Sequence, residues 1–243
     1  MIYLDYNATT PVDEQVLLAM LPYFTEKFGN AASSTHLAGA EAKDAVENAR
    51  AQVAATVNCE AQEIIFTSGA TEAINLAIKG VYNNYQTKGN HIVTVETEHK
   101  AVLDTCKFLE KKGAEVTYLK VDKNGLIDLK ELDNSITEKT ILVCVMYANN
   151  EIGTINPIAN LAEVAKANNI LFHTDAVQAA AYLDVNVSKL GVDLMSLGGH
   201  KFYGPKGVGA LYVRKETKLV PHLTGGSQEF SLRAGTHNVP YIV

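Results

Sequence analysis

The chain has 243 residues, 47% of them hydrophobic and 20% charged, and its formal net charge is -6. This length suits one large α/β domain or two small ones, and the composition is that of a soluble, well-packed protein. The negative charge argues against a nucleic-acid-binding surface, and no apolar run approaches the ~20 residues of a membrane span. The residues after Met1 show no targeting leader, so we expect a cytoplasmic protein without nucleic-acid or membrane partners.

The N-terminal quarter of the chain predicts an arm followed by helices. Residues 1–13 are polar and end in a turn, which is typical of a short strand or an extended arm. A helix is expected over 14–27, and an irregular loop of small residues over 28–36. Residues 37–57 place alanines and charged residues at helical spacing and therefore predict one long helix.

A short apolar strand over 64–66 leads into the turn 67–72, Thr-Ser-Gly-Ala-Thr-Glu, and then into a helix over 73–82. A Gly- and hydroxyl-rich turn at a helix N-terminus suits a phosphate, because backbone N–H groups are free there and the helix dipole favours an anion. The Gly-Lys-Ser/Thr end of a nucleotide P-loop is missing. Taken alone, the turn is better explained by Ser68 or Thr71 capping the helix.

From residue 91 onward, short apolar strands alternate with helices. This alternation indicates a mostly parallel sheet covered on both faces, and the last two strands have no helix between them, so the sheet is expected to be mixed. The strands are expected over 91–95, 116–121, 141–147, 170–174, 192–197 and 208–213, and the helices over 100–112, 128–134 and 160–168.

The last two strands enclose a glycine-rich loop that contains Lys201. Gly198 and Gly199 precede this lysine, and Gly204 and Pro205 follow it. A lysine that forms a Schiff base needs such a fixed backbone, together with enough desolvation to be partly neutral near pH 7. A surface turn solvated by a lysine is the other interpretation, and this stretch alone leaves both open.

The chain has three cysteines, at positions 59, 106 and 144. Their odd number and wide spacing give neither a disulfide framework nor a metal-binding pattern. Cys144 lies in an apolar strand, Cys106 in a helical pattern and Cys59 near a helix end. We interpret all of them as packing residues rather than reactive thiols.

Polar side chains follow strand after strand at the point where each strand ends. In open α/β sheets, ligands bind beyond the carboxyl ends of the strands, so these groups are expected to converge on one site. They are Ser68 to Thr71, His99, Asn149 with Asn150, Asp175 with Gln178, and His200 with Lys201.

This set of residues suits pyridoxal 5'-phosphate (PLP). A lysine forms the Schiff base, and a carboxylate keeps the pyridinium nitrogen protonated, so that the ring acts as an electron sink. A helix N-terminus with hydroxyls takes the phosphate. An imidazole can stack on the ring.

The chain resembles the class V branch of fold-type I PLP enzymes, and within it the bacterial cysteine desulfurases. The matching segments occur in family order and span nearly the whole chain. They are 4–11 (Leu-Asp-Tyr-Asn-Ala-Thr-Thr-Pro), 66–72 (Phe-Thr-Ser-Gly-Ala-Thr-Glu), 97–103 (Thr-Glu-His-Lys-Ala-Val-Leu), 149–153 (Asn-Asn-Glu-Ile-Gly), 175–178 (Asp-Ala-Val-Gln), 199–207 (Gly-His-Lys-Phe-Tyr-Gly-Pro-Lys-Gly) and 233–236 (Arg-Ala-Gly-Thr).

The resemblance implies a role for each matching residue. Lys201 would hold PLP as a Schiff base and move the substrate α-proton, while His99 would stack on the ring and assist proton transfer. Asp175 would pair with the pyridinium nitrogen, Gln178 with the phenolic oxygen, and Asn150 would bind near that oxygen and the substrate carboxylate. Ala70, Thr71 and His200 would hold the phosphate, and Gly198 and Gly199 would be further cofactor-binding residues. Thr236 would reach the phosphate of a partner subunit in a homodimer with shared sites.

The resemblance also implies the whole activity. The fold would be the large domain of a PLP-dependent transferase, a mostly parallel mixed sheet of the seven-stranded type between helices, occupying 1–243 with an arm at about 1–13. The family converts L-cysteine to L-alanine and passes the sulfur to an enzyme cysteine as a persulfide. An iron–sulfur scaffold or another acceptor protein then takes the sulfur. A selenocysteine lyase or other class V enzyme is the rival enzyme, and a non-catalytic PLP-binding or dimerisation scaffold is the rival from another class.

The chain departs from the family pattern at three places. Gly198 stands where a serine is usual, which removes a phosphate-binding hydroxyl and is expected to weaken cofactor affinity by about 1 kcal/mol or somewhat more. Phe230 and Ser231 replace a usual Arg-Gly. The family also continues beyond residue 243 into a smaller C-terminal domain with the nucleophilic cysteine loop, so we expect a fragment that binds PLP without completing desulfuration.

Overall fold

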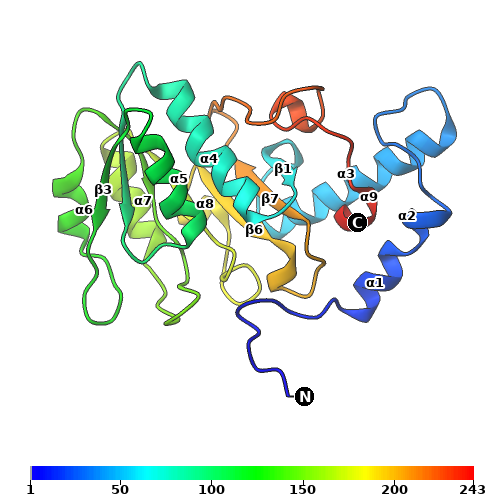
Figure 1. Ribbon diagram of the computed structural model, residues 1–243, viewed down its shortest axis with the longest axis horizontal. Coiled ribbons are helices and arrows are strands. Elements are labelled where there is room, and N and C mark those ends of the chain that lie inside the picture. The colour runs from blue at the N-terminus through cyan, green and yellow to red at the C-terminus, as the bar shows by residue number, and fades with distance from the viewer. Residues whose placement is uncertain (1) are drawn as a thin grey trace.

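The protein, described here by a computed structural model over residues 2–243, is built around one mixed sheet (Figure 1). Among these residues the sheet has seven strands in the order β1-β7-β6-β5-β4-β2-β3. β7 pairs antiparallel with β1 and β6, and the other pairings are parallel. The strands are β1 (Ile64–Thr67), β2 (His91–Val95), β3 (Glu115–Leu119), β4 (Thr140–Cys144), β5 (Leu171–Asp175), β6 (Leu194–Gly198) and β7 (Gly209–Val213).

Helices cover both faces of this sheet and bury two hydrophobic cores. On one face, α4 and α5 pack on strand residues such as Ile92 and Leu142. On the other face, α3, α6, α7 and α8 cover Val143 and Phe172. The helices are α1 (Glu14–Met20), α2 (Pro22–Thr25), α3 (Leu37–Val57), α4 (Ala70–Tyr85), α5 (Lys100–Glu110), α6 (Leu129–Ser135), α7 (Ile158–Ala167), α8 (Val187–Leu190) and α9 (Val239–Ile242), with short 3-10 turns η1 (Ala61–Glu63), η2 (Gly199–Lys201) and η3 (Glu229–Ser231).

The structure confirms the expected fold class and the strand–helix alternation, and it corrects several boundaries. The strand expected over 141–147 ends at Cys144, and the helix expected over 160–168 begins at Ile158. Two further corrections have a clear local cause. The expected helix over 14–27 is divided into α1 and α2, because Pro22 lacks the N–H that a continuous helix needs there. The helix expected from residue 73 begins already at Ala70. Gly69, with φ 147°, is its N-cap, and this angle is one that side-chain-bearing residues rarely adopt.

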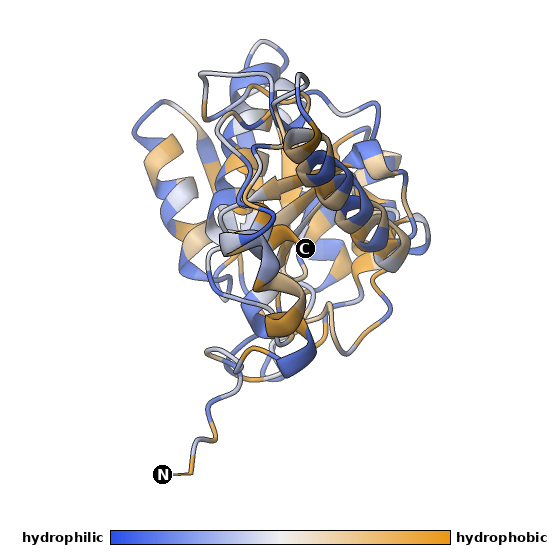
Figure 2. Cartoon of the chain, turned by 90° about the vertical axis from the view of Figure 1, so that its right-hand side faces the viewer, coloured by the Kyte–Doolittle hydropathy of each residue, from blue (hydrophilic) through white to orange (hydrophobic). Residues whose placement is uncertain are grey.

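The N-terminal arm lies against the carboxyl end of β6. Thr10 is buried, and both its N–H and its hydroxyl donate to the backbone oxygen of His200. The first residues of the arm extend away from the body of the protein (Figure 2), and Ile2 and Leu4 are 87% and 85% exposed. Met1, the first residue of the expected arm, lies outside the described residues.

The part of the chain that the structure describes contains no helix with the length and hydropathy needed to cross a membrane.

Candidate active site at the carboxyl edge of the sheet

A cavity of about 800 Å³ lies beyond the carboxyl ends of the parallel strands. Because parallel strands end at one edge of the sheet, residues distant in the chain meet in this cavity. Most of the residues singled out in the sequence line it, as the convergence argument predicts. They are Ala70, Thr71, His99, Asn150, Asp175, Gln178, His200 and Lys201.

Lys201 is held by the N-terminal arm rather than by a carboxylate. Its Nζ donates to the backbone oxygens of Asn7 and Ala8, the latter at 3.1 Å. Burial lowers the pKa of Lys201 from its ordinary value, while the charges of Asp175 and Asp5 act in the opposite direction. The amine is thus pre-positioned in the cavity and is deprotonated more easily than a surface lysine.

Asp175 is the last residue of β5 and is only 5% exposed. Its Oδ1 accepts from the Val177 N–H at 3.0 Å, and within residues 2–243 no hydrogen bond reaches Oδ2. Burial raises the pKa of this carboxyl, although the Val177 N–H, His99 and Lys201 each favour its charged form. One oxygen of a buried carboxylate is therefore free to accept from a cationic donor in the cavity.

Glu98 is a second buried carboxyl next to this wall of the cavity, and the sequence analysis did not give it a role. Its Oε1 accepts from the Met146 N–H at 2.6 Å, whereas Oε2 is buried without a partner among the described residues. Burial raises the pKa of Glu98 well above its ordinary value, and the nearby charge of Asp175 adds to the effect. Burial and the neighbouring Asp175 thus both favour the neutral form of Glu98, because each of two buried carboxyl groups disfavours ionisation of the other.

The histidines of the cavity are fixed by different contacts. His99 is the N-cap of α5, and its Nδ1 accepts from the Ala101 N–H at 3.1 Å, so in the neutral ring the proton is on Nε2. The Nδ1 of His200 lies 3.1 Å from the Thr9 hydroxyl oxygen. Burial lowers the pKa of His200, and the charges of Lys201 and Lys206 lower it further. Each imidazole is therefore held at a fixed orientation by the backbone or by the arm.

The N-terminus of α4 opens into the same cavity. Ala70, Thr71 and Glu72 line it, and within residues 2–243 their backbone N–H groups donate to no other group, because they belong to the first turn of the helix. A Cβ added at Gly69 would meet nothing within 4 Å. Free N–H groups at the positive end of a helix dipole form a cradle for an anion.

Gln178 and Asn150 contribute amide groups to the cavity from two different loops. The Nε2 of Gln178 donates to the Asn7 backbone oxygen at 2.9 Å, so this side chain shares the arm contact of Lys201. The Nδ2 of Asn150 donates to Glu151 Oε1 at 2.9 Å. Both side chains are therefore held near the cavity by contacts that a small molecule could replace.

Three of the residues proposed for cofactor binding do not line the main cavity. Gly198 ends β6 just beneath it, where an added Cβ would lie 3.2 Å from the Ala70 Cβ. Gly199 also lies beneath it, in the turn η2. Thr236 lines a separate cavity of about 110 Å³ that adjoins the first through Ser68.

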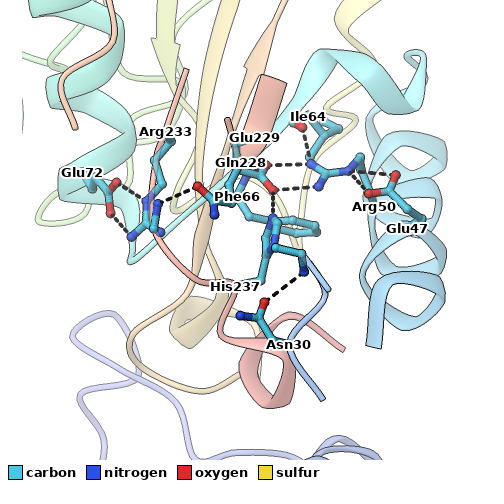
Figure 3. Close-up of polar contacts among 12 residues, drawn as sticks. Asn30, Glu47, Arg50, Ile64, Phe66, Glu72, Gln228, Glu229, Arg233 and His237 are labelled. Carbon is cyan, nitrogen blue, oxygen red and sulfur yellow. Dashed lines mark hydrogen bonds and ion pairs between the residues drawn. The ribbon is translucent and has the colours of Figure 1, made fainter. Parts of the chain in front are cut away.

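The segment carrying Thr236 is anchored by a buried ion-pair cluster (Figure 3). Glu229 is 4% exposed and accepts from Arg50, from the Phe66 N–H and from His237, each at 2.6 to 2.7 Å. Glu229 and the two residues after it have φ between 46° and 65°, a strained region for side-chain-bearing residues. The replacement of Arg-Gly by Phe230 and Ser231 thus leaves a defined turn, held by Glu229.

The structure confirms the packing interpretation of the cysteines. Cys106 and Cys144 are fully buried, and burial raises the pKa of both thiols, that of Cys106 to about 12. Cys59 follows α3, and burial raises the pKa of its thiol to about 12 as well. None of them lines the cavity in the described part of the chain, so none is placed to act as its nucleophile.

Two groups of site residues were missed by the sequence analysis. The carbonyls of Asn7 and Ala8 reach Lys201 from more than 190 positions away, which no local pattern reveals. Glu98 had a usable signal, because it stands between a buried strand and His99. A carboxylate so close to a strand end is a candidate for burial at the site.

Comparison with known proteins gives a consistent result. The family model for class-V aminotransferases matches residues 2–243. A curated relative, the cysteine desulfurase IscS of Dictyoglomus turgidum, is 54% identical over 242 residues, which is 100% of this chain and 61% of the relative. The chain thus spans about three fifths of the length of this relative.

Solved structures agree with the curated relatives. A NifS-like protein superposes with a TM-score of 0.97 at 45% identity, covering 99% of this chain and 66% of that one. The structure of SspA in complex with cysteine has a TM-score of 0.97 at 43% identity, covering 100% of this chain and 70% of that one. These values confirm the expected fold over the whole chain.

Proposed function

Because the chain belongs to the class-V aminotransferase family, we propose that residues 1–243 are the PLP-binding large domain of a cysteine desulfurase. The family and the desulfurase relatives are PLP-dependent enzymes. One observation carries the proposal at the level of the site. A lysine amine with a lowered pKa and a buried carboxylate with one free oxygen line the same cavity as an open helix N-terminus.

The residues present fit PLP in size and in chemistry. The cavity of about 800 Å³ lies within the usual range for cofactor pockets, roughly 300 to 1,000 Å³. The free N–H groups of Ala70 and Thr71 suit the phosphate, Oδ2 of Asp175 suits a protonated ring nitrogen, and Nζ of Lys201 suits the aldehyde carbon. When bound, PLP supplies an electron sink for negative charge at the α-carbon of an amino acid.

Lys201 and Asp175 have complementary tasks in this proposal. Lys201 would hold the cofactor covalently through Nζ and, once free again, would move the α-proton of the substrate. Burial lowers the pKa of this amine and so favours the neutral form that both tasks need. Asp175 would keep the ring nitrogen protonated through Oδ2. The low dielectric around its buried carboxylate strengthens that contact.

The other side chains orient the cofactor and the substrate. His99, with its proton on Nε2 in the neutral ring, would stack on the cofactor ring and assist proton transfer. Gln178 would donate to the phenolic oxygen in place of Asn7, and Asn150 would bind near that oxygen and the substrate carboxylate. Ala70, Thr71 and His200 would hold the phosphate, with Gly198 and Gly199 in the backbone beneath it.

The sulfur chemistry needs a thiol that the cavity does not contain. The proposed overall reaction is L-cysteine plus an enzyme thiol giving L-alanine plus an enzyme persulfide. Cys59, Cys106 and Cys144 do not line the cavity, so we assign this thiol to a segment other than residues 1–243. The greater length of the relatives supports this assignment.

The remaining parts of the proposal concern partners and location. Thr236 lines the smaller cavity outside the main one, and we propose that it serves the phosphate of a second copy of this chain in a homodimer. The sulfur acceptor is proposed to be an iron–sulfur scaffold or another acceptor protein, and the compartment to be the cytoplasm. The desulfurase relatives favour neither a selenocysteine lyase nor a non-catalytic scaffold.

The cofactor site is tested by incubating the purified chain with PLP. We expect the absorption band of lysine-bound PLP, and borohydride reduction followed by peptide mapping should place the label on Lys201. Lys201→Ala should lose the band and the label, and Lys206→Ala, which removes another lysine of the same cavity, should keep the label at position 201. A folded wild-type chain without the band would overturn the proposal and favour the scaffold interpretation.

A further inference from the structure

Glu72 stands inside the anion cradle and carries a charge of the wrong sign. It belongs to the first turn of α4 and lines the cavity together with Ala70 and Thr71. Its Oε2 accepts from the Ser68 N–H at 2.6 Å, which takes one backbone donor of the turn away from any anion in the cavity. Burial would raise the pKa of Glu72, but hydrogen bonds from Arg233 and Ser68 lower it, so the carboxylate is charged at neutral pH.

Arg233 compensates this charge. Its Nε and Nη2 donate to the two oxygens of Glu72 at 2.8 and 3.3 Å (Figure 3). The side chains of Arg233 and Glu72 are 21% and 13% exposed, so solvent screens this pair only in part. The guanidinium comes from the same segment as Glu229, whose buried cluster holds that segment in place.

The pair has two separable effects. As a partly buried ion pair it ties the segment around Arg233 to α4, and this effect needs both charges. The two residues have opposite effects on an anion bound at the first turn of α4, because Glu72 repels the anion and Arg233 attracts it. A purely structural pair would show only the first effect.

We propose that Arg233 and Glu72 together set the phosphate affinity of the cradle, Arg233 as the favourable and Glu72 as the opposing charge. This inference rests on the proposed function, since PLP supplies the phosphate. Both residues act as positioning residues, through the Ser68–Gly69–Ala70 turn and through the local field.

The test compares PLP binding in Glu72→Gln, Arg233→Gln and the double variant by absorbance titration. Glu72→Gln retains an oxygen for the Ser68 N–H and removes the negative charge, so it should bind PLP at least as tightly as wild type. Arg233→Gln leaves the Glu72 charge uncompensated and should weaken binding by about tenfold or more. The double variant should lie closer to wild type than Arg233→Gln does.

Three controls separate the electrostatic effect on phosphate affinity from a structural effect of the ion pair. Pyridoxal lacks the phosphate, so its affinity should not distinguish Glu72→Gln from Arg233→Gln. Thermal unfolding without cofactor should show both single variants destabilised in the same direction, because each breaks the pair. Affinity and stability therefore respond differently to Glu72→Gln. Arg233→Lys keeps the cation and should retain most of the PLP affinity.

A loss of PLP affinity in Glu72→Gln as large as that in Arg233→Gln would overturn the inference, and so would an equal difference between the variants with pyridoxal. If Arg233→Gln does not fold, Glu72→Gln tests the inference alone. Unchanged or tighter PLP binding supports it, and weaker PLP binding overturns it. Failure of wild type to bind PLP would instead overturn the proposed function. The two failures are thus distinguishable.

Discussion

Carboxyl groups are buried in two regions of this molecule, and their pKa values are shifted in opposite directions. In the wall of the cavity, Asp175 and Glu98 have no cation in direct contact within the described chain, and burial raises the pKa of each. In the ion-pair cluster around Glu229, burial would also raise the carboxyl pKa. There Arg50, His237 and the Phe66 N–H lower it to about 2.

This difference in the direction of the pKa shift distinguishes a carboxyl group that stabilises the fold from one that is available to bind a ligand. Glu229 has its cation built in, and it joins α3, β1 and the segment before α9. Asp175 has a free oxygen facing a cavity, and the cation it lacks is the one that a bound pyridinium would bring. A carboxyl buried without its counter-charge costs folding free energy, which is acceptable where the group serves a ligand.

Removing the built-in cation should have the largest effect on stability. Arg50→Met leaves Glu229 buried without its main partner, and the loss of unfolding free energy is expected to be about 3–5 kcal/mol. Urea unfolding measures it. The matched control is Lys139→Met, which breaks the exposed pair with Glu115 and should change stability little. Equal losses in the two variants would contradict the distinction between the cluster and ordinary surface pairs.

The cavity wall should give an effect on the free energy of unfolding that depends on pH. The raised pKa of Glu98 means that the folded state keeps a proton that the unfolded state releases above about pH 4.5. Its contribution to stability is complete below that pH and is lost as pH rises toward the raised folded pKa. Glu98→Gln keeps the acceptor for the Met146 N–H and cannot ionise, so its stability relative to wild type should increase by about 1.4 kcal/mol per pH unit in that interval.

The contribution of Glu229 to stability is expected to depend on pH in the opposite direction, because the pKa of Glu229 is lowered. Its contribution to stability is complete above about pH 4.5 and is lost as pH falls toward 2.

The effect of Glu98 is measured by urea unfolding of wild type and Glu98→Gln between pH 5 and 8. All other titrating groups are shared by the two proteins, so their difference isolates Glu98. A pH-independent difference between the two proteins would show that Glu98 is ionised in the folded state.

Much of the fold could be predicted from the sequence because its signals are local. The strand at 91–95 and the helix at 37–57 are found as predicted, since apolar runs and helical spacing act within a few residues. The exceptions also have local causes. Pro22 divides the expected first helix, and the positive φ of Gly69 lets α4 begin at residue 70.

The sequence predicts which residues meet at the site, but it does not predict the features of the site that depend on tertiary contacts. His99, Asp175 and Lys201 meet as expected because strand ends share one edge of the sheet. The contact of Lys201 with the arm, the raised pKa of Glu98 and the pairing of Glu72 with Arg233 depend on groups far apart in the chain. Burial sets these features, and local sequence patterns contain little information about it.

The most direct test of the account is the protonation state of the ring nitrogen in bound PLP. Nitrogen NMR of PLP labelled at its pyridine nitrogen reads this state in wild type and in Asp175→Asn. We predict a protonated nitrogen in wild type and an unprotonated one in Asp175→Asn, because the asparagine retains the shape of the site and loses the charge. An unprotonated nitrogen in wild type would contradict the claim that Asp175 is buried to receive that cation.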